Sequence, residues 1–169
     1  CIRDRHYGLR MNKVPIIRQI LKNLDTELAN AKEAAEQARL AATDEQSVAE
    51  TQYDTLAIEA GFLAHGQSQR ADELIIAIES IEKLAKQDIK TDTISLGNIV
   101  TLLDENDITH HFYMAPVAGG MTLKLEGLVV TVITPKAPLG QLLLSKHRDD
   151  EVVLTVANTT KEYIVEAID

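Results

Sequence analysis

Residues 14–43 read VPIIRQILKNLDTELANAKEAAEQARLAAT, and their apolar side chains recur in alternating steps of three and four. This alternation is typical of a coiled-coil seam, because it keeps one stripe of the helix apolar. A second series of the same kind follows, up to residue 81. The first series is Val14, Ile17, Leu21, Leu24, Leu28, Ala31, Ala35, Ala38 and Ala42, and the second is Tyr53, Ala57, Ala60, Ala64, Gln67, Ala71, Leu74, Ile78 and Ile81.

The two series match when the chain folds back on itself. Positions 14 and 81, 17 and 78, and so on to 42 and 53 each sum to 95. We therefore predict an antiparallel helical hairpin over residues 12–86, with its tip at about residues 44–49. At about 1.5 Å per residue the hairpin is roughly 45 to 50 Å long, which suggests a reaching device. The alternative is a coiled coil between separate chains, but such a coil would not require the paired positions of one chain to have a constant sum.

Composition limits the classes of partner. The chain has 169 residues and a net charge of −9, and residues 44–82 carry many acids but one base, Arg70. We therefore expect no independent nucleic-acid binding. The single cysteine, Cys1, and the lack of a secretory leader or of an apolar run that could cross a bilayer predict a soluble cytoplasmic protein with no membrane partner.

The rest of the chain divides into an extension, a linker and a compact domain. Residues 1–11 lack the seam pattern and stay unassigned, and residues 87–94 form a polar linker. Residues 95–169 predict a small domain of four or five strands with one short helix. The expected strands are 98–103 and 108–114 as a hairpin, then 128–134, 151–156 and 162–168, with the helix at 138–145. The fold class is α+β.

The end of this domain resembles the closing part of the Gre transcript-cleavage factors. The residues that carry the resemblance are Thr134, Pro135, Lys136, Ala137, Pro138, Leu139 and Gly140, then Leu142, Leu143, Lys146, Asp150 and Val152, and finally Glu162, Tyr163, Ile164 and Val165. The resemblance implies an FKBP-like C-terminal domain behind a coiled-coil hairpin. It also implies a bacterial factor, not itself an enzyme, that binds RNA polymerase at its secondary channel. The hairpin of such a factor enters the channel, modulates elongation and helps the polymerase cleave backtracked RNA.

Acids at the hairpin tip are the candidate functional residues. In this family the tip acids reach the active-site Mg²⁺ of the polymerase, so the resemblance implies that Asp44, Glu45 and Glu50 share that metal; the chain needs no cofactor of its own. Carboxylates suit this role because Mg²⁺ prefers hard oxygen ligands. The family's tip Asp and Glu fall on Gln46 and Ala49 of this chain.

Two alternatives stay open. The tip acids can equally be helix caps, because Ser47 followed by Glu50 fits a capping box. The chain can also be a non-catalytic coiled-coil interaction protein, or a chaperone-like one, that binds partners along its helical faces. A metal site at His110 and His111 is not expected, because adjacent residues of a strand point to opposite faces.

Overall fold

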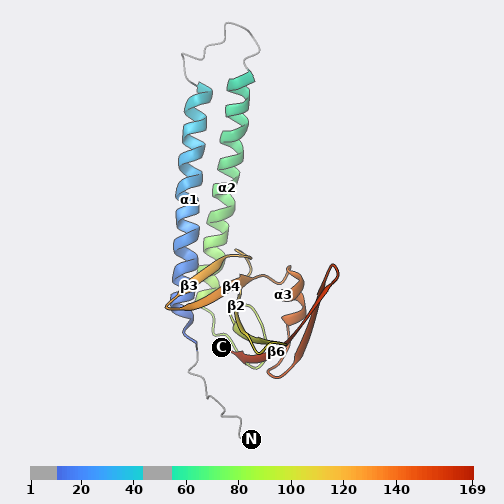
Figure 1. Cartoon of the computed structure of the whole chain (residues 1–169). Coiled ribbons are helices and arrows are strands. Elements are labelled where there is room, and N and C mark those ends of the chain that lie inside the picture. Colours follow the sequence, from blue (N-terminus) through green and yellow to red (C-terminus); the bar gives the residue numbers. More distant parts are fainter. Residues whose placement is uncertain (1–10, 44–54) are drawn as a thin grey trace, which may run out of the picture. The chain divides into compact units, whose positions relative to one another are not determined.

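The computed structural model describes residues 11–43 and 55–169 (Figure 1). Two long helices, α1 (Lys13–Thr43) and α2 (Thr55–Ala85), precede a six-stranded sheet with one short helix, α3 (Pro138–Leu143). The described residues form two compact units, one within residues 21–82 and one that joins residues 11–20 to residues 83–169. The predicted α+β class is confirmed.

The unit of residues 21–82 is an antiparallel helical hairpin, as predicted (Figure 1). Every predicted seam residue that the structure describes in this unit is buried or half-buried. An ion pair joins the helices, since Arg70 Nη2 donates to Glu27 Oε2 over 2.8 Å. Positions 27 and 70 sum to 97, and facing seam positions are predicted to sum to 95. The ion pair therefore lies beside the seam in the expected register.

The seam prediction is wrong at the start of α1. Val14 is 54% exposed, whereas Ile16 and Ile20 are almost fully buried. The first turns of α1 belong to the same unit as the sheet, where the Thr101 hydroxyl donates to Met11 Sδ over 4.0 Å. Here α1 therefore buries a different side from the one that it buries in the hairpin.

The sheet has the strand order β3-β4-β2-β1-β6-β5. Strands β2 and β4 run parallel, and all other neighbours are antiparallel. The predicted β-hairpin of residues 98–103 and 108–114 is confirmed as β1 and β2. The expected number of strands is wrong because β3 was not recognised. Its four residues are too few to show a clear alternation of apolar and polar side chains. The strands are β1 (Ile99–Asp104), β2 (Thr109–Met114), β3 (Thr122–Leu125), β4 (Leu128–Ile133), β5 (Glu151–Val156) and β6 (Thr159–Ile168).

One face of the sheet packs against α3 and forms a continuous apolar core. Ile94, in the segment expected to be a linker, lies in this core, and its backbone bonds to Ser145 and Lys146. Asn98 is fully buried at the entrance to β1, where its side chain binds Ser95, the Lys90 carbonyl and the backbone of the last residue, Asp169. The core consists of Ile94, Val100, Leu102, Met114, Ile133, Leu139, Leu143, Val152, Tyr163 and Val165.

The segment that carries the family resemblance forms the turn from β4 into α3. Pro138 begins the helix, where a missing N–H costs nothing. A Cβ atom on Gly140 would lie 2.0 Å from the carbonyl oxygen of Thr134, so only glycine fits there without moving the backbone. The sequence of this turn is therefore explained by close packing of α3 on the end of β4.

Candidate functional site at the distal end of the hairpin

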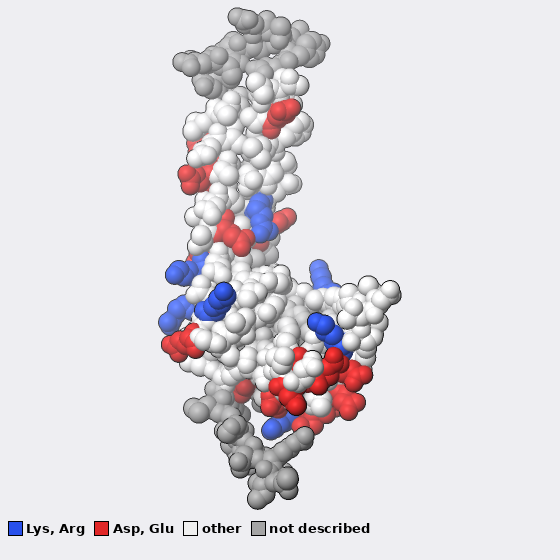
Figure 2. All heavy atoms as spheres, in the orientation of Figure 1, with Lys and Arg blue, Asp and Glu red and all other residues white. Residues whose placement is uncertain are grey.

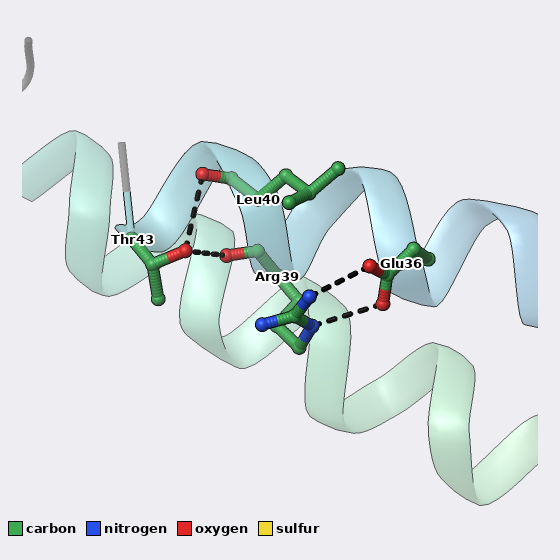
Figure 3. Close-up of polar contacts among 4 residues, drawn as sticks. All are labelled: Glu36, Arg39, Leu40 and Thr43. Atoms are coloured by element: carbon green, nitrogen blue, oxygen red, sulfur yellow. Dashed lines mark hydrogen bonds and ion pairs between the residues drawn. The ribbon is translucent and has the colours of Figure 1, made fainter. Parts of the chain in front are cut away.

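The distal end of α1 is held by contacts within its own last turns (Figure 3). Arg39 donates two hydrogen bonds to the carboxylate of Glu36, from Nε over 2.9 Å and from Nη2 over 2.7 Å. The Thr43 hydroxyl donates to the carbonyl of Arg39 at 3.0 Å and to that of Leu40 at 3.4 Å. Thr43 thus bonds back into the helix that it ends, as short polar side chains do.

Glu36 and Arg39 form an ion pair near this end of α1, with 2.7 Å between Arg39 Nη2 and Glu36 Oε1. The hydrogen bond from Arg39 lowers the pKa of Glu36, and the same contact raises the pKa of Arg39. A second acid, Glu33, accepts a hydrogen bond from Gln37 at 3.2 Å. These carboxylates already have partners on their own helix, and none of them is among the predicted metal ligands.

The predicted tip acids Asp44, Glu45 and Glu50 lie outside the described residues, and so does Tyr53. The structure fixes the two ends that carry them: α1 ends at Thr43, directly before Asp44, and α2 begins at Thr55. The metal role of these acids stays a prediction.

Large exposed hydrophobic residues near the distal end were not predicted. Their exposed fractions range from 53 to 74%, and Phe62 is exposed by 73%. The sequence did contain a signal, because these residues fall outside the three-and-four seam and yet are apolar. The set is Leu40 on α1 and Leu56, Ile58, Phe62 and Leu63 on α2.

The adjacent histidines of β2 have separate partners, as the alternation of a strand predicts. His110 Nε2 lies 2.9 Å from Asp104 Oδ2, and the His110 ring meets the Tyr163 ring edge-on at 5.9 Å between centroids. His111 Nδ1 lies 3.2 Å from the Thr101 hydroxyl, and burial lowers the His111 pKa. Within residues 11–43 and 55–169, no three acidic, histidine or cysteine side chains gather in a way that could hold a metal ion.

Comparison with known proteins gives matches among solved structures only. Gre-type transcription factors are among them. GreA factor homolog 1 (Gfh1) of Thermus thermophilus is 19% identical, with 88% of this chain and 94% of that one covered and a TM-score of 0.38. Gfh1 of Thermus aquaticus is 22% identical over 89% and 92% of the two chains, with a TM-score of 0.37.

The prokaryotic transcription elongation factor GreA/GreB from Nitrosomonas europaea is 14% identical, with 60% of this chain and 92% of that one covered and a TM-score of 0.36. No family model matches the chain, and neither does any curated protein. At these TM-scores the likeness carries no argument of its own, so the function must be argued from the residues. Among the described residues, no helix is long and apolar enough to span a membrane.

Proposed function

We propose that this chain is a Gre-type regulator of bacterial RNA polymerase in the cytoplasm. The observation that carries the proposal is the order of the two parts, a long antiparallel hairpin followed by a β-sheet domain that has the Thr134–Gly140 turn of the family. Each helix of the hairpin has 31 residues, which at about 1.5 Å per residue extends roughly 46 Å. That is much longer than a small domain needs for its own core.

The C-terminal domain is proposed to bind at the rim of the secondary channel, and the hairpin to extend toward the active site. Asp44, Glu45 and Glu50 would then approach the Mg²⁺ of the polymerase, where one carboxylate can bind the metal and another can orient water. The chain acts through the polymerase and is not itself an enzyme. Stimulated cleavage of backtracked RNA is the activity that these acids would support.

The test is transcript cleavage in purified, backtracked bacterial elongation complexes with Mg²⁺. The variant carries Asp44→Asn, Glu45→Gln and Glu50→Gln, and the matched control carries Asp25→Asn, Asp72→Asn and Glu79→Gln, which remove the same charge from exposed positions of the hairpin away from its tip. Shortened RNA with the wild type and the control, but not with the tip variant, is the expected result. Cleavage that is equal with all three proteins contradicts the role of the tip acids.

A second candidate is a non-catalytic interaction protein whose hairpin binds partners through its sides. The exposed apolar side chains on the distal part of α2, led by Phe62, favour it, because such residues often mark binding surfaces. Under this hypothesis neither the wild type nor the tip variant changes cleavage, either alone or in competition with an authentic Gre factor. Loss of partner binding would then follow Phe62→Ser and not the tip substitutions.

A further inference from the structure

Strand β5 is one edge of the six-stranded sheet, and its outer side is open. The strand order ends in β6-β5, so β6 is the only strand that pairs with β5 among the described residues. Residues 152–160, which run from β5 through the turn into β6, contain no charged side chain. Figure 2 accordingly shows the projecting end of this hairpin in white. An uncharged edge strand is free to pair with another strand, because its outer backbone groups have no neighbour.

The opposite edge of the sheet, β3, is protected in the way that natural proteins protect edges. It is only four residues long, and Lys124 is exposed within it. Short edge strands and edge lysines both hinder pairing with a further strand. β5 has six residues and neither Lys nor Pro, and Val153 near its centre is 52% exposed. Of the two edges, β5 is therefore the one suited to pairing.

The turn between β5 and β6 determines which backbone groups face the open side. Ala157 and Asn158 form a two-residue turn, and Val156 and Thr159 are the pair that flanks it. The flanking pair of such a turn is hydrogen-bonded. Hydrogen-bonded pairs then alternate with wide pairs along antiparallel strands, and the backbone groups of a wide pair point away from the partner strand.

Glu151, Val153 and Thr155 are by this alternation the members of β5 in wide pairs, so their N–H and C=O groups point to the open side. Two contacts agree with this assignment. The Thr155 and Thr160 hydroxyls lie 3.2 Å apart, as expected for the closer side chains of a wide pair. Lys146 Nζ, which lies outside the sheet, donates to the Glu151 carbonyl over 3.4 Å. The open edge thus presents backbone donors and acceptors at every second residue.

We infer that β5 pairs antiparallel with β5 of a second copy of this chain, with Val153 opposite the partner's Val153. In this register the N–H and C=O groups of the two valines bond to each other. Those of Glu151 bond to the partner's Thr155, because positions 151 and 155 are equally far from 153. The pairing is two-fold symmetric, so each copy supplies the same residues, and it joins the two sheets into one.

The side chains fit this register as well as the backbones do. On one face of the sheet, Glu151 lies opposite the partner's Thr155, whose hydroxyl bonds to that of Thr160. One of these two hydroxyls keeps a free proton, which can bond to the carboxylate. On the other face, Val152 lies opposite the partner's Leu154, and both pack on the core of their own domain. No two like charges are opposed, so a second copy is complementary in hydrogen bonds, charge and apolar contact at a single register.

The experiment is sedimentation equilibrium of the full chain without polymerase, between about 1 µM and 1 mM. The test variants are Val153→Lys and Val153→Glu, which place two like charges opposite each other at the two-fold axis. The matched controls are Val129→Lys and Val129→Glu, because Val129 is 50% exposed on β4 but β4 has a strand on each side.

The wild type and both controls are expected to form dimers. Each Val153 variant alone should dissociate at least about tenfold more readily, because like charges directly opposite each other destabilise a strand pair. An equimolar mixture of Val153→Lys and Val153→Glu should restore the dimer, since opposite charges then meet at the axis. Thermal unfolding in dilute solution establishes that each variant is folded.

Hydrogen exchange of the wild-type amides, measured by NMR, gives a second readout that needs no substitution. The amide protons of Glu151, Val153 and Thr155 should exchange more slowly as the protein concentration rises, because the partner strand covers them. The outward amide of Lys124 on the other edge serves as the control and should exchange at a constant rate.

Three results would overturn the proposal. A wild type that stays monomeric up to about 1 mM shows that no second copy pairs with this edge. A dimer that both Val153 variants leave intact uses another surface, and its loss in Phe62→Ser would place that surface on the hairpin. If the wild type is monomeric and Val153→Lys alone loses binding to core RNA polymerase, an extended segment of the polymerase occupies the edge instead of a second copy.

Discussion

The helical hairpin and the C-terminal domain bury their apolar side chains in different ways. In the hairpin the buried contacts form one seam that is two helices wide, and toward the tip the seam consists of alanines such as Ala31 and Ala38. In the domain, branched and aromatic side chains from the sheet and α3 close around one another, and Leu102 is fully buried. The domain therefore draws its stability from packing volume, whereas the hairpin depends on a narrow seam that includes small side chains.

The largest expected effect tests this contrast directly. Leu102→Ala should cost about 3–4 kcal/mol of unfolding free energy, because the surrounding sheet and helix cannot collapse into the cavity. Leu74→Ala in the hairpin removes a leucine that is also buried but should cost only about 2 kcal/mol, since its predicted partner Leu21 is only half-buried and can move.

Urea denaturation followed by circular dichroism measures both losses. Leu142→Ala serves as the control, because this leucine is 39% exposed on α3 and should cost well under about 1 kcal/mol. Equal losses for Leu102→Ala and Leu74→Ala would contradict the difference between the two regions.

The seam of the hairpin could be predicted from sequence because its signal is local and repeats. Each seam residue is separated from the next by three or four positions, so the pattern alone identifies the buried stripe. The pattern failed at Val14, which lies in the turns of α1 that belong to the same unit as the sheet and follows Met11, a contact of Thr101 ninety positions away. Where burial depends on segments that are distant in the sequence, the spacing of apolar residues does not show which side of the helix is buried.

The same reasoning explains what was predictable in the domain. Strand β4 is a nearly continuous apolar run and β5 has an apolar centre at residues 152–154, so both were located closely, whereas β3 is short and becomes a strand by pairing with β4. The bulge at Glu166 in the pairing of β6 with β1 could not be predicted, because it depends on the register of two strands that are far apart in the sequence. The candidate tip acids rest on the family resemblance alone.

The second prediction tests the close approach of the distal helices. Ala38→Leu should destabilise the hairpin by about 1–2 kcal/mol, because Ala38 is 6% exposed and the seam has no room for a larger side chain. Ala41→Leu, three residues later on the exposed side of α1, should change stability by less than about 0.5 kcal/mol. Thermal unfolding of the two variants gives the comparison, and a stabilising Ala38→Leu would show that the helices are farther apart there than we infer.

The smallest expected effect compares one lowered carboxyl pKa in each region. In the domain, Asp104 accepts hydrogen bonds from the His110 ring and from the backbone N–H groups of Ile108 and Asn106, and these contacts lower its pKa. In the hairpin, the pKa of Glu36 is lowered chiefly by the single side chain of Arg39. A lowered folded-state pKa means that the stabilisation is present above the unfolded-state pKa and is lost as the pH falls toward the folded-state value.

Both carboxyls should therefore contribute at neutral pH and lose their contribution below about pH 4. Asp104→Asn should lower the acid sensitivity of the stability more than Glu36→Gln does, because two of the donors to Asp104 are backbone N–H groups of its own turn, whereas Arg39 is a solvent-exposed side chain. Thermal midpoints between pH 7 and pH 3 at low and high salt measure this. Added salt should reduce the contribution of Glu36 and leave most of that of Asp104. The reverse order would mean that the turn between β1 and β2 opens before the end of α1 does.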